Sequence, residues 1–132
     1  MKKLVKISAL ALVLIMMVAV FASCAAPAKD PKDAKKALED AGYEVTLIDG
    51  DMAAMIGVKG LEAAIMAYSE ENEDDGVFIY YFEDKDAANE AWEDIEKEVE
   101  ELKKANEDVE FIVKKSGTMI WYGTKDAIKA AK

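Results

Sequence analysis

The chain has 132 residues with 17 lysines against 27 acidic residues, a net charge of −10 at neutral pH, and this length suits one domain. It has no histidine or arginine and one cysteine, Cys24, which excludes His-dependent nucleophilic and zinc sites and a disulfide within one chain. The residues after Ser23 carry 14 lysines and 27 acidic residues, and their net charge of −13 argues against nucleic acid as a partner.

The N-terminal residues have the three zones of an export signal. A basic head, Met1 to Lys6, precedes an apolar run from Ile7 to Ala22 that only Ser8 interrupts, and a segment of small residues follows. As a helix, this apolar run would extend about 24 Å, which is shorter than the ~30 Å hydrocarbon core of a bilayer. We therefore expect residues 1–23 to be a signal peptide and not a permanent membrane span.

The end of this signal, Phe21-Ala22-Ser23-Cys24, resembles the lipobox of bacterial lipoproteins, in which small residues precede a cysteine. The resemblance covers residues 1–24. It implies that cleavage falls before Cys24, that Cys24 receives a diacylglyceryl group, and that the protein is anchored in the cell membrane on the extracytoplasmic side. The alternative is ordinary signal peptidase cleavage after Ala25 or Ala26, which would give a secreted protein without an anchor.

Residues 24–30 are predicted to form the lipidated end and a short tether. The sequence Ala25 to Asp30 is too small and too poor in branched side chains to pack, and it would span ~20 Å when extended. The folded domain is expected over residues 31–132. Its acidic surface adds no attraction to anionic headgroups, so we expect it to stand off the bilayer on its tether.

The first half of this domain carries clear boundary signals. Asp30 and Pro31 are typical of a helix start, and Gly42 is typical of its end. The alternating residues 43–48 predict a strand, and residues 52–56 suit one helical turn. Residues 61–69 contain helix formers, but the glycines upstream and the short acidic connection downstream favour a strand paired with the next segment.

The second half predicts a central strand, a long helix, a hairpin and a short helix. The apolar run 77–82 needs cover on both faces, and Asp84 is the expected N-cap of a helix over 85–105. Two strands over 109–115 and 118–122 are joined by Ser116-Gly117, and a helix follows over 125–131. The order predicts an α+β domain: a single antiparallel sheet of four or five strands with helices packed on one face, ferredoxin-like in character.

The predicted hairpin places Ile112, Met119 and Trp121 on one face, beside charged residues, while its other face suits the core against the long helix. Helices on one side of the sheet would leave these three residues facing solvent. Aromatic and methionine side chains rimmed by charge are typical of protein interfaces, so we predict a partner-binding or self-association surface here. The alternative is that residues 52–58 or the last helix cover this group.

The acidic clusters do not match a site with known chemistry. The run 70–75 fails as an EF-hand because Phe82 falls where a bidentate glutamate is required, although weak cation binding stays an alternative. No phosphate-binding loop, nucleophile elbow or metal-ligand spacing is present in the sequence. We therefore expect no enzymatic activity, no metal and no cofactor. The predicted function is a membrane-anchored lipoprotein that binds a protein partner or itself, with a small-ligand or cation-binding lipoprotein as the alternative.

Overall fold

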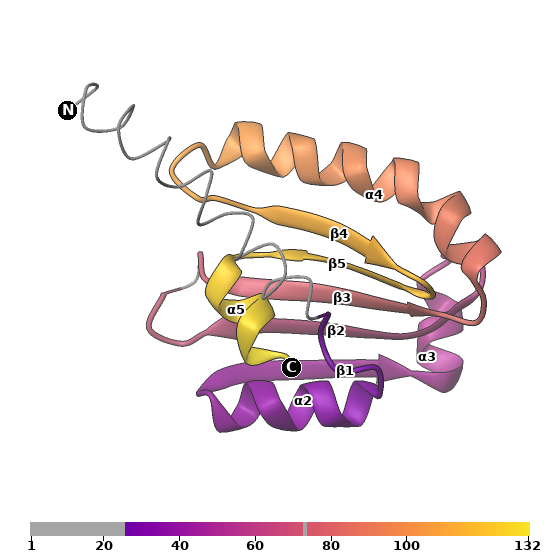
Figure 1. Ribbon diagram of the computed structural model, residues 1–132, viewed down its shortest axis with the longest axis horizontal. Helices are drawn as coiled ribbons and strands as arrows, with labels where there is room; N and C mark the ends of the chain where they lie inside the picture. The colour runs from indigo at the N-terminus through magenta and orange to yellow at the C-terminus, as the bar shows by residue number, and fades with distance from the viewer. Residues whose placement is uncertain (1–25, 73) are drawn as a thin grey trace, which may run out of the picture.

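The computed structural model describes residues 26–72 and 74–132, shown in Figure 1. The predicted signal peptide, residues 1–23, and the lipobox cysteine, Cys24, lie outside the described residues. In the part of the chain that the structure describes, no helix has the length and apolar character needed to cross a membrane.

The described chain forms one five-stranded antiparallel sheet with four helices, which confirms the predicted α+β class. The strand order is β1-β2-β3-β5-β4, so β3 is central, as its apolar sequence predicts. The predicted strand over residues 61–69 is confirmed with the same bounds. In chain order the elements are α2 (Pro31–Asp40), β1 (Tyr43–Asp49), α3 (Gly50–Met55), β2 (Leu61–Ser69), β3 (Gly76–Phe82), α4 (Lys85–Ala105), β4 (Ile112–Ser116), β5 (Met119–Gly123) and α5 (Lys125–Ala130).

Side-chain caps define where the two longer helices begin. The carboxylate of Asp30 accepts a hydrogen bond from the backbone N–H of Lys32 at 2.9 Å, and Pro31 occupies the first turn of α2. The carboxylate of Asp84 accepts from the N–H of Ala87 at 2.8 Å at the start of α4. Each cap satisfies a backbone donor that has no partner inside the helix, so both helices begin where the sequence predicts.

The β4–β5 hairpin turns one residue later than the sequence predicts. Ser116 pairs with Met119, so the loop residues are Gly117 and Thr118 and not Ser116 and Gly117. Gly117 has φ +59°, and glycine with positive φ at the first loop position is typical of a type II′ turn. Compared with the predicted pairing, the register is shifted by two residues. An even shift leaves every side chain on its predicted face.

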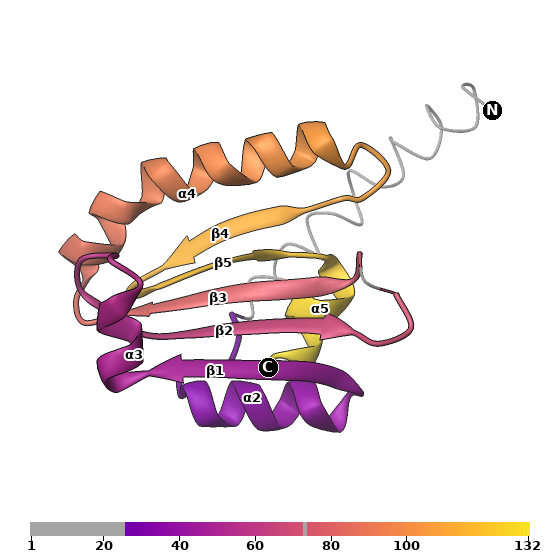
Figure 2. The same cartoon turned by 180° about the vertical axis from the view of Figure 1, so that it is seen from behind.

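Helices cover both faces of the sheet, so the prediction of helices on one face is wrong. Helices α2 and α5 pack on one face, and α3 and α4 pack on the other, as Figures 1 and 2 show from opposite sides. The physical reason lies in β3. Val77, Ile79 and Tyr81 point into the first core and Tyr80 and Phe82 into the second, so neither face can be left in water.

The segment before α2 packs on the domain, so the expectation of an unpacked tether is wrong for its described part. Pro27 is fully buried. The backbone N–H of Ala28 donates to the carbonyl of Ala131 at 2.9 Å, and the Ala28 carbonyl accepts from the Tyr81 hydroxyl at 2.8 Å. Small residues allow the backbone to approach α5 and the sheet closely enough for these bonds.

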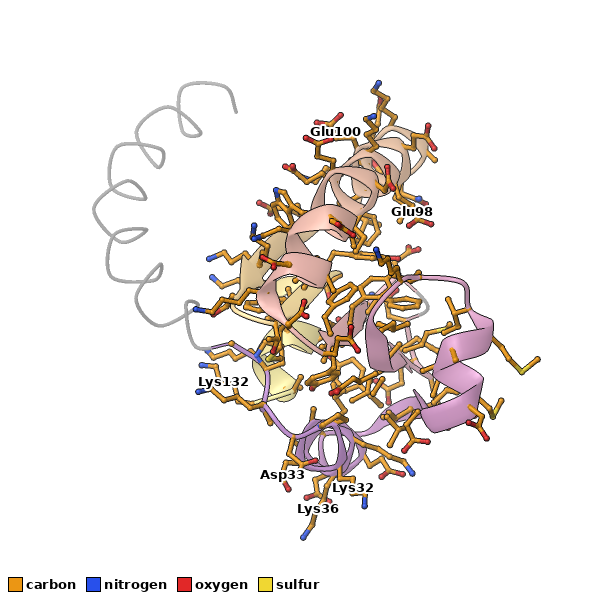
Figure 3. All side chains as sticks on the ribbon, turned by 90° about the vertical axis from the view of Figure 1, so that its right-hand side faces the viewer. Lys32, Asp33, Lys36, Glu98, Glu100 and Lys132 are labelled. Atoms are coloured by element: carbon orange, nitrogen blue, oxygen red, sulfur yellow. The ribbon has the colours of Figure 1, made fainter. Side chains whose placement is uncertain are left out.

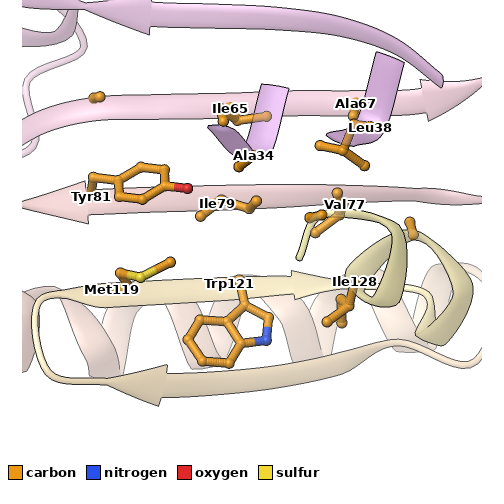
Figure 4. Packing of buried hydrophobic residues seen from close by; sticks show 13 residues of the cluster. Ala34, Leu38, Ile65, Ala67, Val77, Ile79, Tyr81, Met119, Trp121 and Ile128 are labelled. Atoms are coloured by element: carbon orange, nitrogen blue, oxygen red, sulfur yellow. The ribbon is translucent and has the colours of Figure 1, made fainter. Parts of the chain in front are cut away.

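The burial of α2 against the sheet can be tested at Leu38, which is fully buried between α2 and β2 in Figure 4. We expect Leu38→Ala to lower the free energy of unfolding by about 2–5 kcal/mol, because the substitution leaves a cavity. Met55→Ala is the control, since Met55 is 84% exposed, and its effect should stay below about 0.5 kcal/mol. Urea denaturation measures both, and equal losses would contradict the packing.

Candidate functional site

The surface predicted around Trp121 is not open. Trp121 is 2% exposed and Met119 is buried beside it (Figure 4), while Ile112 is half-buried against the same core. Helix α5 covers them through Ala127 and Ile128, which is the alternative that the sequence left open. The prediction that Ile112, Met119 and Trp121 form an exposed partner-binding surface is therefore wrong.

The opposite face of the sheet is only partly covered. Thr46, Met66, Phe78, Tyr122 and Val113 are successive neighbours across the five strands on this face. Helix α4 packs over the β3, β5 and β4 part of the row, but Met66 on β2 stays 42% exposed. On the same face of β2, Tyr68 is 40% exposed. The β2 side of this face is therefore in contact with solvent.

An open hollow of about 520 Å³ lies at the boundary between the covered and uncovered parts. Strands β2, β3 and β5 form its floor, and the segment that follows α4 contributes Asn106 and Phe111 to its wall. We call this hollow the aromatic groove and define it by its apolar lining residues, Met66, Tyr68, Phe78, Phe111 and Tyr122.

Stacked rings hold the floor of the aromatic groove in place. The Phe78 ring lies 5.6 Å from the Tyr122 ring at an interplanar angle of 11° and 4.8 Å from the Tyr80 ring at 26°. Tyr80 stacks in turn on Phe82, with ring centroids 6.2 Å apart. Such ring contacts add to the burial energy of each residue, so the groove is formed before any ligand arrives.

The hydroxyl groups beside the groove are held in their neutral form. Burial is the largest cause that raises the pKa of Tyr80 and of Tyr122, and the nearby negative charge of Glu98 on α4 raises both further. Both hydroxyls therefore stay protonated near neutral pH. The groove offers aromatic faces and neutral hydroxyls, which can donate and accept hydrogen bonds.

Helix α3 lies on the same side of the sheet as α4 (Figure 2) and adds exposed apolar side chains to it. Ala53 anchors this helix in the α4-side core, while Met52, Met55 and Ile56 are exposed. Methionine side chains are flexible and polarizable and adapt to irregular partners. Together with Met66 and Tyr68, these residues are the exposed large hydrophobic side chains of the described chain.

A second, acidic hollow of about 720 Å³ lies at the same end of the sheet as the aromatic groove, where the loop after β2 meets the start of α5, and Asp74 lines both hollows. One carboxylate in it, Asp75, accepts hydrogen bonds from the Tyr43 hydroxyl at 2.8 Å and from the Thr124 hydroxyl. These bonds tie the acidic loop to β1 and to the start of α5. Across residues 26–72 and 74–132, no three acidic, histidine or cysteine residues are grouped closely enough to hold a metal ion.

Comparison with known proteins does not assign this arrangement to a family. No protein-family model matches the sequence, and the searches of curated proteins and of solved structures give no match either. The function must therefore be inferred from the residues and their geometry.

The sequence analysis missed the aromatic groove, although one signal for it is visible in retrospect. Met66 and Tyr68 are two residues apart on a strand and so share a face, as alternating side chains do. The other groove residues belong to strand or loop segments that suit a closed core equally well. What distinguishes them is the position at which α4 ends, and side-chain patterns do not fix that position in space.

The raised tyrosine pKa values predict a loss of stability at alkaline pH. The pKa values of Tyr43, Tyr80, Tyr81 and Tyr122 are raised above 10.0, so each stays protonated in the folded protein while its unfolded form ionises above about pH 10. The stabilisation of the folded protein that these protonated tyrosines provide is fully present below pH 10 and is lost as the pH rises further. We expect the free energy of unfolding to fall by about 1.4 kcal/mol per pH unit for each of Tyr80, Tyr81 and Tyr122, and by less for the more exposed Tyr43, where solvent screens the interaction.

Urea denaturation at increasing pH, with tyrosinate absorbance recorded in parallel, measures this effect. In Tyr80→Phe, the free energy of unfolding should fall less steeply with pH, by about the contribution of one tyrosine, because phenylalanine has no proton to lose. Ionisation of all tyrosines near pH 10 in a protein that stays folded would contradict the burial of these hydroxyls.

Proposed function

We propose that the protein is a lipid-anchored, non-catalytic binding module on the extracytoplasmic side of the cell membrane. Cys24 carries the anchor, and the aromatic groove binds an apolar segment of a partner protein. The observation that supports this proposal is the open aromatic groove, in which Met66 and Tyr68 are exposed. The opposite face of the sheet is closed by α2 and α5.

The chemistry of the surface favours a protein partner. Exposed apolar side chains gather on one side of the domain, on α3 and β2, and interface cores are enriched in methionine and aromatic residues. Phe78 and Tyr122 are partly buried and stacked on each other, so they would lose little conformational freedom on binding. An apolar segment laid in the groove would cover Met66, Tyr68 and Phe78 together.

The negative charge around the groove favours a partner segment that carries basic residues. Asp74 lines the groove, and the charge of Glu98 on α4 reaches Tyr80 and Tyr122. The mature chain as a whole carries −13. A partner segment with lysine or arginine flanking its apolar residues would be attracted to this rim and would associate faster. A second copy of the same acidic chain would be repelled, which disfavours self-association through this groove.

A small apolar ligand is the second candidate function. The groove volume of about 520 Å³ lies within the range of small-molecule sites, roughly 300–1,000 Å³, and a few polar groups line it. The openness of the hollow along β2 favours an extended partner over an enclosed ligand.

The anchor is tested by the mass of the mature N-terminus in cells that express the full chain. We expect the wild-type protein to begin at Cys24 and to carry a diacylglyceryl group, since the thiol is the acceptor. Cys24→Ala should incorporate no lipid, whereas the matched variant Ser23→Ala keeps a small residue before the cysteine and should be lipidated normally. An unmodified wild-type N-terminus that begins at Ala26 or Pro27 would contradict the anchor and support a secreted protein.

The groove is tested by a photo-crosslinking residue at Tyr68 in the full-length protein in intact cells. We expect a defined crosslink to a polypeptide segment that combines apolar and basic residues. Met66→Glu should lower the yield at least about tenfold, because a carboxylate would be placed against the apolar segment, and Met66→Leu should preserve it.

A crosslinking residue at Glu100, which lies on the exposed side of α4, is the control for nonspecific capture. Capture of a second copy of this chain would assign the groove to self-association. An unchanged yield in a folded Met66→Glu variant would show that the groove does not bind the captured protein.

A further inference from the structure

We infer that the domain lies on the membrane with one defined side, the side of α2 and α5, against anionic lipid headgroups. This replaces the expectation, drawn from the net charge of the whole chain, that the domain stands off the bilayer. This side consists of residues 26–41 and 124–132, and we call it the basal strip. The inference rests on the proposed anchor at Cys24. It places the aromatic groove on the opposite face of the sheet, directed away from the bilayer.

The first argument is the distance between the anchor and the strip. The chain is fixed to the domain from Pro27, which is buried, and Ala28, which bonds to Ala131 and Tyr81. Only two residue steps separate Cys24 from Ala26, and two steps span at most about 7 Å. This is less than the Debye length of about 8 Å at physiological salt, so charges beside Ala26 would feel the charge of the membrane surface.

The second argument is the distribution of charge. The basal strip carries seven of the 14 lysines that follow Ser23 but only five of the 27 acidic residues, a net charge of +2. The rest of the chain after Ser23 carries seven lysines and 22 acidic residues, a net charge of −15. The lysines of the strip are Lys29, Lys32, Lys35, Lys36, Lys125, Lys129 and Lys132.

The structure separates the lysines of α2 and of the end of α5 from the acidic residues of α4, whereas the start of α5 borders the acidic hollow. Figure 3 shows Lys32 and Lys36 on α2, with Asp33 beside them, and Lys132 after the end of α5, while Glu98 and Glu100 project from α4 at the opposite end of the domain. An anionic surface attracts lysines within about a Debye length and repels acidic side chains. The acidic face of α4 would therefore turn outward, and the basal strip would turn toward the headgroups.

The experiment uses the full-length protein purified from membranes and reconstituted into vesicles. One set of vesicles contains phosphatidylglycerol and phosphatidylcholine in equal amounts, and the other contains phosphatidylcholine alone. A membrane-impermeant amine-acylating reagent labels exposed lysines, and peptide mass spectrometry gives the labelling rate of each. We expect Lys32, Lys36 and Lys129 to react about fivefold more slowly on the anionic vesicles. Lys97, Lys103 and Lys104 on α4 are also exposed, and they should react at the same rate on both sets of vesicles.

Matched charge variants separate orientation from general attraction. Replacement of Lys32, Lys36 and Lys129 by glutamine removes three charges from the basal strip, and replacement of Lys97, Lys103 and Lys104 by glutamine removes three from α4. The protection of Lys125 on anionic vesicles should disappear in the first variant and persist in the second. High salt should also remove it, because the attraction is electrostatic.

Three outcomes would overturn the inference. Equal labelling of both lysine sets on anionic vesicles, with the protein lipidated and vesicle-bound, would show anchoring without orientation. Protection produced by inorganic phosphate without anionic lipid would assign the strip to a soluble anion. A wild-type protein that lacks the Cys24 lipid by mass and does not float with vesicles would refute the anchor itself and, with it, this orientation.

Discussion

The fold depends on the need to remove β3 from water on both of its faces. Six consecutive apolar residues, 77–82, alternate between two cores, so a sheet backed on one side would expose three of them. The domain meets this need with the long helix α4 and the short helix α3 on one face and with α2 and α5 on the other. The aromatic groove is a consequence of this division, because α4 is centred over β3, β5 and β4 and leaves β2 partly uncovered.

The sequence predicts the elements well where a boundary has a local chemical cause. Asp30 and Asp84 satisfy backbone donors at helix starts, and their positions alone locate α2 and α4. The hairpin after α4 shows the limit of local signals. Gly117 can occupy either position of a two-residue loop, so its presence does not fix which residues pair. The faces of β4 and β5 were nevertheless predicted correctly, because strand alternation survives a slide of two residues.

The site was harder to predict, for a physical reason that Trp121 illustrates. Alternation states which side chains share a face, but it does not state what covers that face. The element that covers Trp121 is α5, which has six residues and is too short for a clear helical period. Met66 and Tyr68 present the converse case, since their strand has the pattern of a core element and yet its outer half lacks a covering helix. Which helix covers a given face depends on how the elements pack in three dimensions, and the pattern of side chains along the sequence does not determine this.

The docking of Ala28 also determines how mechanical load enters the domain. A pull on the chain upstream of Ala26 reaches two bonds first, from Ala28 to Ala131 and from Tyr81 to Ala28. The first leads into the end of α5, and the second leads directly to β3 at the centre of the sheet. Tension is thus divided between a short peripheral helix and the most deeply held strand. Both bonds belong to Ala28, so load on this segment reaches the C-terminal helix and the central strand before it reaches α2.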